Sequence, residues 1–177
     1  MKAPILIFWF RRDLRFEDNV GLYHALYQAK LQGHQVLPLF IFDKNILSQQ
    51  VEKKDRRVDF IHRTILSMQD KLVAKGKSMC VMFGSPIEVF EKLFKLYKVN
   101  GVYTNHDYGP KANERDDSIA KLAEQAGATY HHFKDQVIFE KSEVVKDDGT
   151  PYTVYTPYMK KWRSLFRPND HTPEYTI

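Results

Sequence analysis

The chain has 177 residues, of which 43% are hydrophobic and 28% are charged, a composition typical of one globular domain rather than a disordered segment. No apolar run approaches the roughly 20 residues of a membrane helix, so we expect neither a membrane span nor a signal peptide. The net charge of +5 permits attraction to nucleic acid or acidic ligands without demanding either. Cys80 is the only cysteine, which excludes an internal disulfide and leads us to expect a buried thiol and a cytoplasmic setting.

The chain begins with a run of six apolar residues, Ile5 to Phe10, typical of a strand buried on both faces of a parallel sheet. The charged triplet Arg11-Arg12-Asp13 follows this strand. Asp18 is then expected to cap a helix over 19–32, which Gly33 ends.

A second strand is expected at 36–42, where Pro38 predicts an early or local break in the hydrogen-bond ladder. A polar loop at 44–55 leads into a long helix that Gly76 ends. Its apolar stripe has helical spacing and comprises Val58, Ile61, Ile65, Met68 and Leu72.

The alternation of strands and helices continues in the second half of the chain. The remaining strands are expected at 78–83, 101–105 and 129–133. Between them, a helix capped by Ser85 runs from Pro86 to Lys98, and another covers 111–126. The first of these two helices is expected to bury Val89, Phe90, Leu93 and Leu96.

This pattern predicts an α/β fold, a doubly wound five-stranded parallel sheet with helices on both faces, similar to a Rossmann fold, over residues 1–135. Residues 136–177 are expected to form an extended linker. Within it, Thr156 and Pro157 are placed to start a short helix.

Polar side chains follow the first, second and fourth predicted strands. They are Arg11, Arg12 and Asp13, then Asp43, then Asp107. Because the carboxyl ends of parallel strands meet at one edge of a sheet, these side chains would line a common pocket there. The alternative is that they merely solvate the ends of buried strands.

Several common sites are not supported by the sequence. Charge replaces the glycines that a dinucleotide fingerprint needs after the first strand, and there is no P-loop motif. His131 and His132 are neighbours in a strand and therefore point to opposite faces, so we expect no shared metal.

Four motifs resemble the DNA photolyase and cryptochrome family when taken together and in this order. They are Trp9-Phe10-Arg11-Arg12-Asp13-Leu14-Arg15 with Asp18-Asn19, Asn105-His106-Asp107-Tyr108 with Glu114-Arg115-Asp116, Lys134-Asp135-Gln136, and the run from Pro151 to Pro157 ahead of Trp162.

The resemblance implies an N-terminal domain that holds an antenna chromophore, followed in complete members by a helical domain that binds FAD and damaged DNA. In such enzymes excitation passes from the antenna to reduced FAD, which gives an electron to a flipped-out pyrimidine dimer. We therefore expect this chain to be the antenna part of a deoxyribodipyrimidine photolyase, without repair activity of its own.

In relatives that hold deazaflavin or flavin in this domain, the pigment lies at the strand ends. The matching positions here are Arg11, Arg12, Asp43, Arg57 and Asp107. Arginines would bind ring carbonyls or a phosphate, and aspartates would accept from ring NH groups or hydroxyls. The alternative for Arg57 is an ion pair with Asp43.

Folate-binding relatives use an Asn-Glu pair after the fourth strand. Asn113-Glu114 resembles it, but an ungapped count puts Lys111 and Ala112 there, so a flavin or deazaflavin is favoured over folate. Many relatives bind no antenna at all.

Other functions remain open at this point. A cryptochrome-type light receptor would share the same domain, and a free-standing nucleotide- or flavin-binding module would have the same sheet. The basic cluster from Lys160 to Arg163 would contact DNA phosphates or form a helix that docks on the helical domain.

Overall fold

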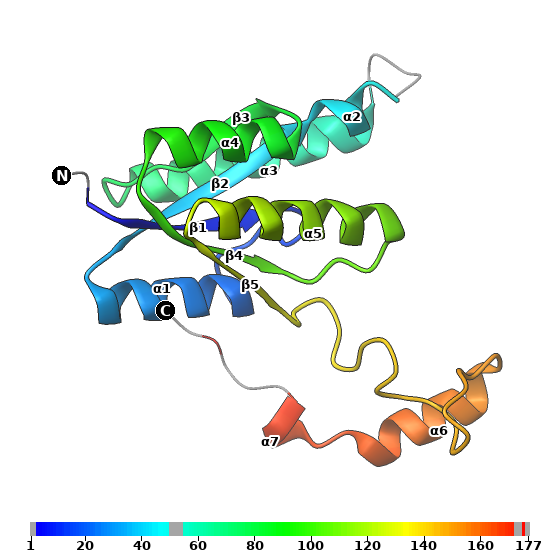
Figure 1. The fold of residues 1–177 in the computed structure, drawn as a ribbon. Helices are drawn as coiled ribbons and strands as arrows, with labels where there is room; N and C mark the ends of the chain where they lie inside the picture. Colours follow the sequence, from blue (N-terminus) through cyan, green and yellow to red (C-terminus); the bar gives the residue numbers. More distant parts are fainter. Residues whose placement is uncertain (1–2, 50–54, 172–174, 176–177) are drawn as a thin grey trace.

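The computed structural model describes residues 3–49, 55–171 and 175, and strands alternate with helices through its first 133 residues (Figure 1). The strands are β1 (Ile5–Phe10), β2 (Gln35–Asp43), β3 (Cys80–Gly84), β4 (Val99–Asn105) and β5 (Thr129–Phe133). The helices are α1 (Val20–Gln32), α2 (Lys44–Leu47), α3 (Arg56–Val73), α4 (Pro86–Leu96), α5 (Pro110–Gln125), α6 (Tyr155–Leu165) and α7 (Pro168–His171).

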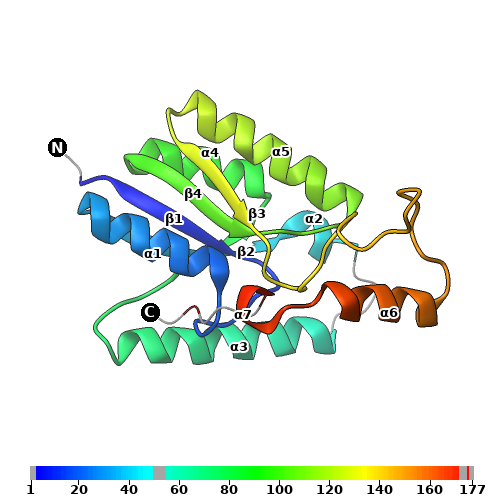
Figure 2. The same cartoon turned by 90° about the horizontal axis from the view of Figure 1, so that it is seen from below.

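The strands form one five-stranded sheet in the order β3-β2-β1-β4-β5, and every neighbouring pair is parallel. Figure 2 shows α4 and α5 on one face of this sheet and α1 and α3 on the other. The predicted doubly wound α/β fold is therefore confirmed. In the described part of the chain, no helix combines the length and apolar character needed to cross a bilayer.

The core divides into two layers, one on each side of β1, whose six residues are all buried. Ile7 and Trp9 pack with Phe90 of α4 and Ile119 of α5. The even-numbered residues of β1, including Phe8, pack with α1 and α3 on the opposite face. A strand that is apolar at every position is therefore what this two-sided packing requires.

Several local expectations are confirmed in detail. Ser85 and Glu88 form a capping box at the start of α4, and Gly33 ends α1 in the left-handed conformation with φ 66°. Pairing of β2 with β3 begins only at Leu39, so Pro38 lies where β2 has β1 as its partner but not yet β3.

Other expectations need correction. The N-cap of α1 is Asn19, whose side chain accepts from the backbone NH of Leu22, and not Asp18. Leu96 is 44% exposed because it is the last residue of α4, beyond the buried stripe. Cys80 is half-buried, and this partial burial raises the pKa of its thiol.

The segment expected to be a polar loop, 44–55, begins with the short helix α2. Asp43 stops β2 and caps α2 by accepting from the backbone NH of Asn45. Residues 50–54 of this segment lie outside the described part of the chain.

The segment after β5 runs away from the sheet to α6, which contains no buried residue (Figure 1). The expected short helix around Thr156 is thus present as α6. The start of this segment is attached to the domain, because Glu140 contacts His106 after β4 at 2.8 Å. The division into a domain over 1–135 and a linker over 136–177 stays a prediction.

Helix α1 approaches the end of β4 so closely that only a glycine fits at position 21. A Cβ there would lie 2.6 Å from Asn105 Oδ1 and 2.9 Å from the ring of Phe8. We expect Gly21→Ala to lower the free energy of unfolding by about 1–3 kcal/mol, as overpacking of a dense interior does.

Urea unfolding followed by circular dichroism measures this effect. Gly109→Ala is the matched control, because a Cβ at Gly109 meets nothing within 4 Å. An equal loss of stability in both variants would contradict the steric explanation.

Candidate functional site

A cavity of about 690 Å³ lies at the carboxyl ends of the sheet, beside the first residues after β1, β2 and β4. The order β3-β2-β1-β4-β5 reverses direction between β1 and β4, and ligands of open α/β sheets bind at such a switch point. The volume falls within the range of roughly 300–1,000 Å³ usual for cofactor pockets. The cavity is therefore the candidate binding site.

The walls of this cavity are largely apolar and partly aromatic. They comprise Trp9, Phe10, Phe40, Ile41, Phe42, Ile46, Leu47, Val58, Ile61, Pro86, Ile87 and Ala112. Val58 and Ile61 belong to the predicted apolar stripe of α3, so one helix face supplies both core and cavity wall. Such walls suit a flat ligand with a large aromatic body.

Four of the five predicted site residues line the cavity, namely Arg11, Arg12, Asp43 and Asp107. The fifth, Arg57, is not among the lining residues of the described chain. The polar lining also includes residues that the sequence reasoning gave no binding role, such as Lys111 and Arg115 of α5.

The guanidinium of Arg11 is held by the protein itself. Its Nη1 donates to both carboxylate oxygens of Asp116 at 2.6 Å, and its Nη2 donates to the backbone carbonyl of Asn105. The Arg11 side chain is only 7% exposed, so this ion pair is largely shielded from water. Arg11 thus connects β1, the end of β4 and α5 and forms a fixed part of the cavity wall.

Arg12 lies at the rim and is far less constrained. Its side chain is 69% exposed, and its Nη1 lies 3.6 Å from Asp107 Oδ1. Asp107 is itself 13% exposed and also lies 3.7 Å from Arg115. The Arg12 guanidinium is therefore positioned to exchange a loose protein contact for a ligand atom.

Asp43 and Arg57 take separate partners. Asp43 caps α2, while Arg57 contacts Asp55, the N-cap of α3, with Nη2 to Oδ2 at 2.5 Å. Hydrogen bonds from Arg57 lower the pKa of Asp55 to about 2. The Arg57–Asp43 pair considered from the sequence is thus replaced by an Arg57–Asp55 pair at a helix start.

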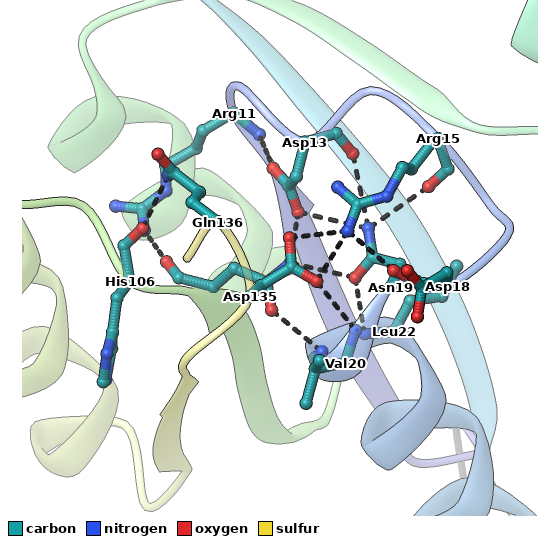
Figure 3. Close-up of polar contacts among 12 residues, drawn as sticks. Arg11, Asp13, Arg15, Asp18, Asn19, Val20, Leu22, His106, Asp135 and Gln136 are labelled. Atoms are coloured by element: carbon teal, nitrogen blue, oxygen red, sulfur yellow. Dashed lines mark hydrogen bonds and ion pairs between the residues drawn. The ribbon is translucent and has the colours of Figure 1, made fainter. Parts of the chain in front are cut away.

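A buried polar network fixes the chain that leaves β1 (Figure 3). The side-chain amide of Asn105 donates to Asp13 Oδ2 at 2.6 Å and to Asn19 Oδ1 at 2.9 Å, and its oxygen accepts from the NH of Gly21 at 2.8 Å. Asp13 also accepts from the backbone NH of Arg11 at 3.0 Å. Asp13 is therefore a buried structural carboxylate rather than part of the cavity lining.

The same network reaches the end of β5. Asp135, whose side chain has no exposed surface, accepts from the NH of Val20 at 3.0 Å and binds Arg15 at 2.9 Å. The carboxylate therefore sits at the N-terminus of α1, where it is bound by both a backbone NH of the helix and the arginine. The Lys134-Asp135-Gln136 motif thus has a structural role, because its aspartate fixes the start of α1.

The family model for DNA photolyase matches residues 6–175. A deoxyribodipyrimidine photo-lyase from Synechococcus is 32% identical over 95% of this chain and 34% of its own length.

Two solved structures have the same fold. An archaeal photolyase from Sulfolobus tokodaii, described with two FAD molecules, is 35% identical with a TM-score of 0.69, over 80% of this chain and 32% of that one. A class III photolyase from Agrobacterium tumefaciens is 24% identical with a TM-score of 0.80. The match covers 95% of this chain and 33% of the Agrobacterium chain. The chain thus spans about a third of the length of the photolyases it matches.

The shielded ion pair between Arg11 and Asp116 should be costly to break from one side. We expect Asp116→Asn to lower the free energy of unfolding by about 3–5 kcal/mol, because it leaves the buried Arg11 charge without its carboxylate. Urea unfolding provides the measurement.

Asp59→Asn is the control, because Asp59 forms an exposed pair with Arg63 on the surface of α3. Its loss should cost at most about 0.5 kcal/mol. Similar stability of the Asp116 and Asp59 variants would show that the buried pair does not hold the cavity wall.

Proposed function

Because the chain belongs to the DNA photolyase family, we propose that it forms the antenna-binding part of a deoxyribodipyrimidine photolyase, which repairs pyrimidine dimers in DNA with light. The observation that carries the proposal is the apolar, aromatic cavity at the switch point of the sheet. The photolyase function is favoured over a cryptochrome-type receptor because the Synechococcus relative and the Sulfolobus tokodaii structure, 32% and 35% identical to this chain, are both photolyases.

The ligand that fits this cavity best is a flavin or deazaflavin. The apolar walls suit a tricyclic ring, Arg12 is placed to donate to a ring carbonyl or phosphate, and Asp43 and Asp107 are placed to accept from ring NH or hydroxyl groups. The 35% identity to a photolyase described with two FAD molecules supports this class. Such a pigment absorbs light and passes the excitation to a second flavin.

Within the cavity, the protein's own residues would orient the pigment and exclude water. Arg11 is engaged with Asp116 and contributes a rigid wall, whereas the exposed Arg12 is available to the ligand. Arg57 would contribute indirectly, by fixing the start of α3 through Asp55 and so placing Val58 in the wall. Folate is disfavoured because Lys111 and Ala112 occupy the positions of the expected Asn-Glu pair.

We assign dimer cleavage to a helical FAD-binding domain, of the kind that complete members of the family carry, with damaged DNA as its substrate. The described fold over residues 3–171 is an α/β sheet with a short helical extension.

Riboflavin binding tests the assignment of the cavity. We expect the protein to bind riboflavin in equilibrium dialysis and Asp107→Asn to weaken binding by about 10-fold, the loss of roughly one charge-assisted hydrogen bond. Asp117→Asn is the control, because Asp117 is an exposed residue of α5 outside the cavity lining. No binding, or equal weakening by both variants, would contradict the proposed site.

A repair assay tests where the chemistry lies. We expect the 177-residue chain, illuminated with dimer-containing DNA and FAD, to leave the dimers intact because the assigned FAD site is not in this fold. The Synechococcus photo-lyase, assayed in parallel, is the positive control. Light-dependent cleavage by the 177 residues would overturn the division of roles.

A further inference from the structure

Trp9 occupies an unusual electrostatic position in the cavity wall. It is only 2% exposed and packs edge-on against Phe90, and it lines the cavity at the end of β1. The guanidinium carbon of Arg11 lies 5.2 Å from the centroid of its ring, and that of Arg115 lies 5.0 Å away. Two cations from different elements thus face one indole.

These cations belong to a connected group of charges. Asp116 binds both Arg11 and Arg115, and Asp107 contacts both Arg115 and Arg12. The group contains three arginines and two aspartates, so its net charge is +1. The carboxylates hold the guanidiniums of Arg11 and Arg115 in place, 5.2 and 5.0 Å from the centroid of the ring.

The position matters because indole is among the most readily oxidised side chains. An excited aromatic pigment in contact with Trp9 would be able to accept one electron from the indole. That step would make and break no bond, would leave a radical cation on Trp9, and would be reversed by return of the same electron. The excitation energy would be lost as heat instead of being passed on.

We propose that Arg11 and Arg115 protect the excited pigment from quenching by making Trp9 a poor electron donor. A positive charge about 5 Å from the ring opposes a second positive charge on it, and the effect is strong where water is excluded. The inference rests on the proposed pigment-binding function. It makes Arg115 a positioning residue for excitation transfer, acting through Trp9.

The test uses riboflavin bound at saturation and measures its fluorescence lifetime. All variants carry Trp162→Phe, which removes the second indole of the chain. In this background, Arg115→Gln should shorten the lifetime by about twofold or more, since it removes the nearer positive charge. Arg115→Lys, which keeps a charge, should retain most of the lifetime.

A second substitution separates quenching from a change in packing. Trp9→Phe added to Arg115→Gln should restore the long lifetime, whereas Trp9→Phe alone should change it little because the protected indole does not quench. Circular dichroism and equilibrium dialysis confirm that each variant is folded and loaded.

The outcomes separate the two proposals. Absence of riboflavin binding by the parent protein would overturn the proposed function and this inference with it. Binding with an unchanged lifetime in Arg115→Gln, or a shortened lifetime that persists without Trp9, would overturn the inference alone. If Arg115→Gln shortens the fluorescence lifetime of bound riboflavin and Trp9→Phe restores it, the proposed protection of the pigment is supported.

Discussion

The fold of this domain depends on the way Asn105 closes the edge of the sheet. Its side chain binds Asp13 after β1 and both Asn19 and Gly21 at the start of α1. Its backbone carbonyl accepts a hydrogen bond from the Arg11 guanidinium. An amide is suited to this position because it offers donors and an acceptor at once. Each of these polar groups is buried and would cost free energy if left unpaired, so the partners specify one another.

This closure decides which charges are structural and which face the cavity. Protein partners occupy the charged groups of Asp13, Arg11 and Asp116, which hold β1, β4 and α5 together. Arg12, by contrast, lies at the rim with a side chain that is 69% exposed. Adjacent residues at the end of one strand thus have different tasks. The rigid pair forms the wall, and the exposed neighbour keeps its hydrogen-bonding capacity for a ligand.

Much of the fold could be predicted from the sequence because β1 is apolar throughout and the helices carry clear stripes and caps. The strand at 129–133 and the Ser85 cap depend on local signals and are confirmed. The contacts of the site were harder to predict, since nothing local shows that Arg11 pairs with Asp116, 105 residues away. Charged residues that follow a strand indicate where the carboxyl edge of the sheet lies. They do not indicate which charged residues pair with one another there.

The contact between Arg15 and Asp135 joins residues 120 positions apart, so it forms only when β5 has joined the sheet. During synthesis, a chain that ends at β4 would already have the strands and helices around most of the cavity, yet the start of α1 would lack its carboxylate. Contacts of such long sequence separation come late in folding, after the entropy of closing the loop has been overcome. The start of α1 therefore takes its final position only after the last strand has joined the sheet, so this contact reports completion of the domain.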